Sequence, residues 1–98
     1  IQTLYDDLVE QGSKSLVDAL VVGATIEDMD IVDLQLRRSG IEAIDDVYAN
    51  LEKGSRNHLR AFIRTLERQG GEYVPAFLTV AEYEAIFSSP TERARSGA

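Results

Sequence analysis

Residues 16–34 read LVDALVVGATIEDMDIVDL, an aliphatic stretch that is interrupted by acidic residues near its centre. The stretch lacks proline, and its apolar residues recur at intervals of three and four, as on a helix face. Gly40 is the first strong helix-terminating residue after it, so a long helix is expected over residues 16–38. Because such an aliphatic helix is typical of a core, the question is which of its carboxylates points inward.

The rest of the chain is predicted to be helical apart from one connection. A second long helix is expected from Ile41 or Glu42 to Arg68, and the turn at 39–40 would make the two long helices antiparallel. The fold is therefore predicted to be all-α, an antiparallel hairpin of two long helices with short flanking helices, in one domain over 1–87. The remaining predicted elements are a helix over 3–11, an irregular segment over 72–78, a helix over 80–87 capped by Thr79 and Glu82, and a flexible tail over 88–98.

The composition argues against several classes of partner. The chain has 98 residues and a net charge of -7, whereas nucleic acids and anionic membrane surfaces bind clustered Lys and Arg, so neither partner is expected. No apolar run approaches the roughly 20 residues that span a bilayer, and no membrane insertion is expected. The chain has no cysteine, which excludes disulfides and zinc–thiolate sites. It begins at Ile1 rather than at methionine, so upstream sequence is expected and the compartment stays open.

Helical periodicity separates the acidic residues of the first long helix. At about 100° per residue, Glu27 falls on the same face as Leu16 and Leu34, so its carboxylate is expected to point inward. Asp30 lies on the margin of that face, three residues from Glu27 and next to it on the helix surface. The other acidic residues fall outside the face and are expected in solvent: Asp18, Asp28 and Asp33.

The second long helix has a clear apolar face with two polar residues on it, Ser55 and His58, the only histidine of the chain. The apolar residues of this face are Ile41, Ile44, Val47, Tyr48, Leu51, Leu59, Phe62 and Leu66. The opposite face is expected in solvent and carries Glu42, Asp46, Lys53, Arg56, Asn57, Arg60, Arg64 and Glu67.

Glu27 and His58 are expected to approach each other across the hairpin. Glu27 lies 13 residues before Gly40 and His58 lies 18 residues after it. The difference corresponds to an axial offset of about 7 Å, which shrinks because helical side chains lean toward the N-terminus of their helix. The pattern is compatible with a direct contact or with an ion that bridges the two side chains.

Structural explanations exist for the same residues. A single histidine on an apolar face is often a hydrogen-bonded core residue, and Glu27 could extend to solvent or pair with Arg56. The occurrence of Glu27 and His58 on the apolar faces of both long helices favours a binding site. A buried carboxylate without a partner costs several kcal/mol, so a cation is expected beside it. Gly23 and Gly54, which lower helix propensity, are interpreted as positions of close helix packing.

Two further strings point to a known family. LYDDLVEQGSKSLVDALVVGATIEDMDIVDL (4–34) and VYANLEKGSRNHLRAFIRTLERQGGEYVPAFLTVAEYEAI (47–86) resemble the C-terminal half of the ferritin-like proteins grouped as domain-of-unknown-function family 2202. The most specific parts are IEDMDI and GSRNHLRAF. Ferritin-like proteins are four-helix bundles whose two metals take a Glu from each of two helices and a Glu-x-x-His from each of the others.

The resemblance implies a divalent iron, manganese or zinc ion with Glu27 and His58 as ligands and Asp30 as a ligand or a residue that orients one. Ser55 stands where the Glu of the Glu-x-x-His motif would be, so it would lie beside the ligands without binding metal. The resemblance covers half of a bundle, and a homodimer is expected to complete it. Redox turnover by this chain alone is not expected. The competing hypothesis is a non-catalytic structural or protein-interaction module in which a buried Glu27–His58 pair sets the helix register.

Overall fold

The computed structural model describes residues 2–12, 15–37 and 40–93. Within these ranges the chain forms four α-helices and no strand, which confirms the all-α prediction. The helices are α1 (Gln2–Gly12), α2 (Leu16–Leu36), α3 (Glu42–Arg68) and α4 (Val80–Ser88). The end of α2 lies two residues before the predicted one, and the predicted last residue, Arg38, is outside the described residues.

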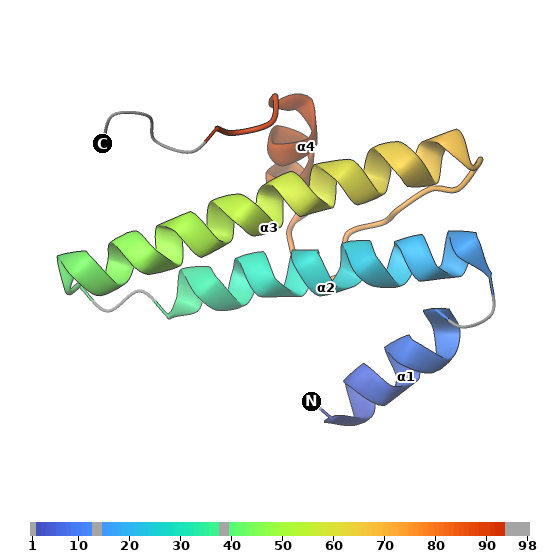
Figure 1. Cartoon of the computed structure of the whole chain (residues 1–98), viewed down its shortest axis with the longest axis horizontal. Coiled ribbons are helices and arrows are strands. Elements are labelled where there is room, and N and C mark those ends of the chain that lie inside the picture. The colour runs from blue at the N-terminus through green and yellow to red at the C-terminus, as the bar shows by residue number, and fades with distance from the viewer. Residues whose placement is uncertain (1, 13–14, 38–39, 94–98) are drawn as a thin grey trace.

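The two long helices, α2 and α3, lie side by side and antiparallel along most of their length (Figure 1). The shorter helix α1 packs on α2, and α4 packs on α3. Ser15 caps α2 by accepting a hydrogen bond from the Asp18 amide at 3.0 Å. At α4 the predicted capping box is present, because Thr79 and Glu82 each accept from the other's backbone N–H.

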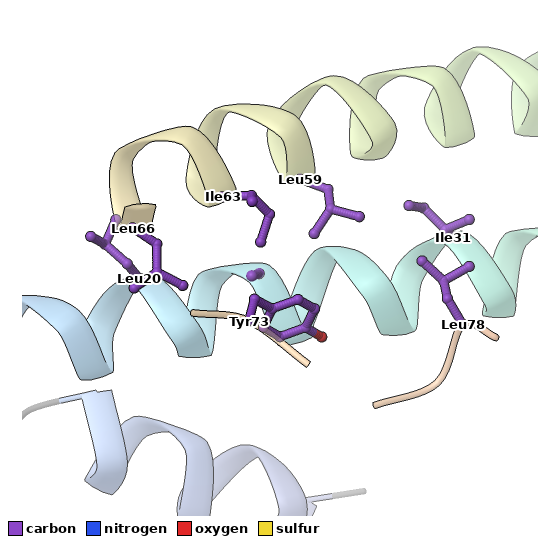
Figure 2. Packing of buried hydrophobic residues seen from close by; sticks show 8 residues of the cluster. Leu20, Ile31, Leu59, Ile63, Leu66, Tyr73 and Leu78 are labelled. Carbon is purple, nitrogen blue, oxygen red and sulfur yellow. The ribbon is translucent and has the colours of Figure 1, made fainter. Parts of the chain in front are cut away.

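The core lies between α2, the C-terminal half of α3 and the connection to α4 (Figure 2). In Figure 2 the aliphatic side chains of α3 point toward α2, and Tyr73 and Leu78 approach α2 from the connecting segment. The buried residues of this cluster are Leu20, Ala24, Ile31, Leu59, Ile63, Leu66, Tyr73 and Leu78. The connecting segment therefore contributes core side chains although it forms no helix.

The apolar face predicted for the second long helix is buried only in part. Leu59 and Leu66 are in the core, as predicted. At the N-cap and in the N-terminal half of α3 the large aliphatic residues of this face are exposed: Ile41, Ile44, Val47 and Leu51. The connecting segment packs near the C-terminal half of α3, and among the described residues nothing covers the aliphatic side chains of the N-terminal half.

Gly23 is a site of close helix packing, as predicted, and Gly54 is not. A Cβ atom on Gly23 would lie 2.6 Å from Cε1 of Phe62, so the aromatic ring rests directly on the α2 backbone. A Cβ atom on Gly54 would meet nothing within 4 Å among the described residues. The interpretation of Gly54 as a packing position is therefore wrong for the contacts within this chain.

Arg60, predicted on the solvent face of its helix, is only 2% exposed. Its guanidinium donates to the Ile86 carbonyl at 2.8 Å and pairs with Glu92 at 2.9 Å. The correction has a physical reason: α4 and the chain that follows it lie over this part of α3 and supply the acceptors. Glu92 belongs to the predicted tail 88–98, of which residues 94–98 lie outside the described residues, and the boundary between domain and tail stays a prediction.

Candidate functional site

The carboxylate that α2 buries completely is that of Asp28, which periodicity placed in solvent. Asp28 is 0% exposed, so the prediction for this residue is wrong. Its Oδ2 atom accepts from the Tyr73 hydroxyl at 2.5 Å and from the Ala76 amide at 2.8 Å. Its Oδ1 atom accepts from the Leu78 amide at 2.7 Å and from the Phe77 amide at 3.2 Å. Asp28 thus fixes the connecting segment to α2.

Asp28 supplies hydrogen-bond acceptors to the backbone of the connecting segment. The segment between α3 and α4 has no regular structure, so its buried N–H groups need acceptors from elsewhere. One carboxylate provides acceptors for three successive amides, those of residues 76–78. Burial is the main reason that the pKa of Tyr73 is raised above its usual value, and the bond to Asp28 adds to it. Asp28 is therefore a structural anion and is not a free ligand.

Glu27 and His58 meet across the hairpin, as the spacing predicted. Oε1 of Glu27 lies 3.4 Å from Nδ1 of His58, and together they line a pocket of about 400 Å³. The Glu27 side chain is 15% exposed, whereas that of His58 is 68% exposed. The Oε2 atom of Glu27 is buried and has no hydrogen-bond partner among the described residues. The remaining pocket residues are Leu20, Ala61, Phe62 and Thr65.

The electrostatics of Glu27 favour a nearby cation. Burial raises the pKa of Glu27 above its usual value, although the charge of His58 and the Ser55 hydroxyl both lower it. Asp30 is close enough to raise the pKa of Glu27 further, and burial raises the pKa of Asp30 itself. The structure thus places Glu27, His58, Ser55 and Asp30 in one neighbourhood, with Ser55 buried.

Substitution of Glu27 by glutamine is expected to stabilise the metal-free chain at pH 7 by about 1 kcal/mol, since it removes a negative charge that burial destabilises. The sign follows from the raised pKa of Glu27. Below the ordinary pKa of 4.5 the carboxyl is protonated in both states, and its penalty appears only as the pH rises above that value. Urea unfolding with chelator present should show a difference at pH 7 that vanishes near pH 4.

A matched control is Glu84→Gln on α4, whose side chain is exposed and which should show no pH-dependent difference. If Glu27→Gln is instead less stable than wild type at pH 7, the contact with His58 outweighs the burial of the carboxylate. That result would contradict the expectation that Glu27 requires a cation in addition to His58.

In 2–12, 15–37 and 40–93 no group of three or more His, Asp or Glu side chains is placed to hold a metal ion. Asp30 therefore does not complete a three-ligand site with Glu27 and His58 in this chain. The alternative pairing of Glu27 with Arg56 is wrong, because Arg56 pairs with Glu52 at 3.0 Å and with Glu92 at 2.7 Å.

His58 lies on a helical stripe of α3 that also carries exposed aliphatic residues. Leu51 and Ile44 follow His58 at intervals of seven residues toward the N-terminus of α3, so they share its helical stripe. Leu51 is 52% exposed and Ile44 is 41% exposed. We call this surface, formed by Ile44, Leu51, His58 and Glu27, the hairpin face.

Sequence reasoning found Glu27 and His58 because each interrupts an apolar stripe, and it missed Asp28 and Arg60. Their partners are far away in the sequence: Asp28 binds residues 73–78, and Arg60 binds Ile86 and Glu92. The usable signal for Asp28 was the segment EYVPAFL itself, because its apolar residues indicate burial and its irregular backbone requires acceptors.

Among the helices that the structure describes, none is long and apolar enough to cross a membrane. The chain is 55% identical over 94 residues to the uncharacterized protein MJ0754 of Methanocaldococcus jannaschii, an alignment that covers 94% of this chain and 51% of that protein. It also matches the crystal structure of the hypothetical protein MJ0754 from Methanococcus jannaschii with a TM-score of 0.87 and 55% identity. That superposition covers 93% of this chain and 53% of the other.

The chain thus spans about half the length of the relative that it matches. A family model described as an uncharacterized protein domain, DUF2202, matches residues 1–90. Since this match includes all four helices, the chain belongs to the DUF2202 family.

Proposed function

We propose that the chain is half of a ferritin-like, metal-binding four-helix bundle in which Glu27 and His58 are ligands of a divalent transition metal. The observation that carries the proposal is the Oε2 atom of Glu27, which is buried without a hydrogen-bond partner among the described residues. A carboxylate oxygen in that state is expected to bind a cation or a donor supplied from outside the hairpin. The pocket that it shares with the exposed His58 side chain faces outward, toward that supply.

The donor types fit iron, manganese or zinc, since these ions accept mixed carboxylate and imidazole ligands. Two ligands are too few for such an ion, and Ser55 occupies the position where a Glu-x-x-His motif would have its carboxylate. The missing ligands must therefore come from helices that pack on the hairpin face. A metal bound there would supply a Lewis-acid or redox centre, and this chain would contribute Glu27, His58 and the nearby Asp30.

A second copy of the chain is the proposed source of the other ligands. Two hairpins that face each other about a two-fold axis would form a four-helix bundle and bring together two Glu27 and two His58 side chains. The exposed aliphatic residues of α3 are suited to such an interface, because association would remove them from water.

The metal proposal is tested on the intact chain, purified without chelator and analysed for bound transition metals, followed by calorimetric titration of the metal-free protein with Zn²⁺. We expect stoichiometric metal, and an affinity that falls at least about tenfold in Glu27→Gln and in His58→Gln, a range typical of altered metal surroundings. The control Glu84→Gln should bind as wild type does. Absence of metal together with no measurable Zn²⁺ binding at the hairpin face would refute the proposal.

The second candidate is the non-catalytic module in which Glu27 and His58 set the helix register, favoured by their 3.4 Å contact. The exposure of the His58 side chain, 68%, weighs against a fully buried pair within one chain. If this candidate is correct, His58→Gln changes the pH dependence of the free energy of unfolding. Neither Glu27→Gln nor His58→Gln then changes Zn²⁺ binding. The two candidates therefore differ in the result of the same titration.

A further inference from the structure

A second groove lies between α3 and the chain that follows α4. It has a volume of about 1270 Å³ and is lined on the α3 side by Lys53, Arg56 and Arg60. This concentration of cationic side chains contrasts with the net charge of -7 of the whole chain. Three residues of the segment 89–93 that also lines the groove, Ser89, Pro90 and Thr91, are exposed.

Glu92 is bound in this groove by two guanidinium groups. Arg56 donates through Nε to Oε2 and through Nη2 to Oε1, both at 2.7 Å, which is the bidentate geometry of arginine–carboxylate recognition. Arg60 donates through Nη2 to Oε2 at 2.9 Å. These donors lower the pKa of Glu92 to about 2. The carboxylate of Glu92 is therefore held as an anion by two cations one helical turn apart.

The main chain at Glu92 is recognised as well. The side-chain amide of Asn57 donates to the Glu92 carbonyl at 2.8 Å, and its oxygen accepts from the Glu92 N–H at 2.8 Å. A single Asn side chain thus satisfies both backbone groups of one extended residue. Lys53 adds a hydrogen bond to the next carbonyl, that of Arg93, at 3.1 Å. A free phosphate or carboxylate ion has no N–H and C=O pair to offer Asn57, so the geometry is specific for a peptide.

The segment that carries Glu92 is attached by polar contacts and is not part of the core. It follows Ser88, the last residue of α4, and has neither helical nor strand structure. Pro90 has no N–H to donate, and it disfavours helical backbone at Ser89, which is extended with φ -88° and ψ 149°. None of the core side chains comes from residues 89–93. The segment therefore lies on α3 as a bound peptide would.

We propose that the α3 surface formed by Lys53, Arg56, Asn57 and Arg60 is a recognition site for an extended peptide with an acidic side chain. Residues 89–93, which form the opposite wall of the groove, occupy this surface as an intramolecular ligand. The partner is a protein segment that presents Glu or Asp where Glu92 lies, with free main-chain N–H and C=O groups at that residue. Asn57 reads the backbone, whereas Arg56 and Arg60 read the carboxylate. The site is filled by exchange of one acidic segment for another.

The burial of Arg60 favours replacement of the Glu92 segment by another acidic segment over release of the Glu92 segment alone. Arg60 is 2% exposed, and its Nε and Nη1 groups are bound to the Ile86 carbonyl and to Asn57. Without Glu92, the buried guanidinium of Arg60 would lose the one carboxylate that pairs with it among the described residues, and it would lie next to the like charge of Arg56. An incoming carboxylate removes that cost, so an acidic peptide is favoured over an empty groove.

The test uses a fluorescein-labelled peptide with the sequence SSPTER, residues 88–93, and the intact 98-residue chain. Anisotropy is expected to show at least about tenfold tighter binding to Glu92→Ala than to wild type, since the variant lacks the competing carboxylate. Addition of Asn57→Ala to that variant, or use of the peptide SSPTQR, should weaken binding by a similar factor. Circular dichroism and thermal melting establish that each variant is folded.

Two outcomes would overturn the proposal: equal binding of SSPTER and SSPTQR, or no binding of SSPTER to the folded Glu92→Ala chain at millimolar peptide. If Glu92→Ala does not fold, Glu92→Gln and wild type are compared by the ¹⁵N resonances of the Asn57 side-chain amide during the same titration. A shift of these resonances with SSPTER but not with SSPTQR supports exchange, and unchanged resonances at millimolar SSPTER contradict it. Neither readout depends on metal binding at the hairpin face.

Discussion

Replacement of Asp28 by alanine is expected to destabilise the folded chain by about 3–5 kcal/mol, since each buried donor that loses its acceptor costs about 1–3 kcal/mol. The substitution leaves three backbone amides and the Tyr73 hydroxyl without their acceptor, and the bonds of Tyr73 and Leu78 are buried. Small domains have a total stability of about 5–15 kcal/mol, so the substitution would remove a large part of the free energy of unfolding. Urea unfolding followed by circular dichroism measures the loss.

Two further variants separate the carboxylate from its partners. Asp28→Asn keeps the shape but presents an NH₂ group to donors, and it should be destabilised almost as strongly as the alanine variant. Tyr73→Phe removes a single donor and should cost about 1–2 kcal/mol. The matched control is Asp33→Ala, an exposed acid on the same helix whose contact with Arg37 is a surface pair worth less than about 1 kcal/mol. Equal stability of Asp28→Ala and Asp33→Ala would contradict the structural role of Asp28.

The helices could be predicted from sequence because their signals are local. The apolar repeat over 16–34, the glycines that follow both long helices and the Thr79–Glu82 capping box each act within a few residues. The buried faces were harder to predict, because they depend on what packs against each helix. α2 has apolar residues on all sides, so its periodicity could not show that a second surface, around Asp28, faces residues 73–78.

The same distinction explains the candidate site. Glu27 and His58 were predictable because each is the polar residue in an apolar stripe, and antiparallel geometry brings the two stripes together. The buried state of Arg60 was not predictable, since it depends on Ile86 and Glu92, which are 26 and 32 residues away. The exposed aliphatic residues of α3 follow the predicted periodicity, so the pattern predicted the helix face, whereas burial of that face depends on what packs against it.

Self-association through the hairpin face is expected to be lost in Leu51→Glu. Leu51 is 52% exposed in the single chain, so a glutamate there should change the stability of the monomer little. At the centre of a two-chain bundle the same glutamate would be buried without a partner in both copies. We expect the dissociation constant of the dimer to rise at least about 100-fold, which corresponds to about 2.7 kcal/mol. Sedimentation velocity over a range of protein concentrations measures this change.

The control is Val74→Glu, the same introduced charge at a residue that is 74% exposed but lies on the connecting segment and not on the hairpin face. Val74→Glu should leave the dissociation constant of the dimer unchanged. A general effect of the more negative net charge would instead weaken association in both variants. If wild type sediments as a monomer at every concentration, a second copy does not cover the hairpin face, and the two Glu27 and two His58 side chains cannot form one site. Loss of Zn²⁺ binding in Leu51→Glu, with both ligand residues intact, would in turn show that the metal needs residues of both chains.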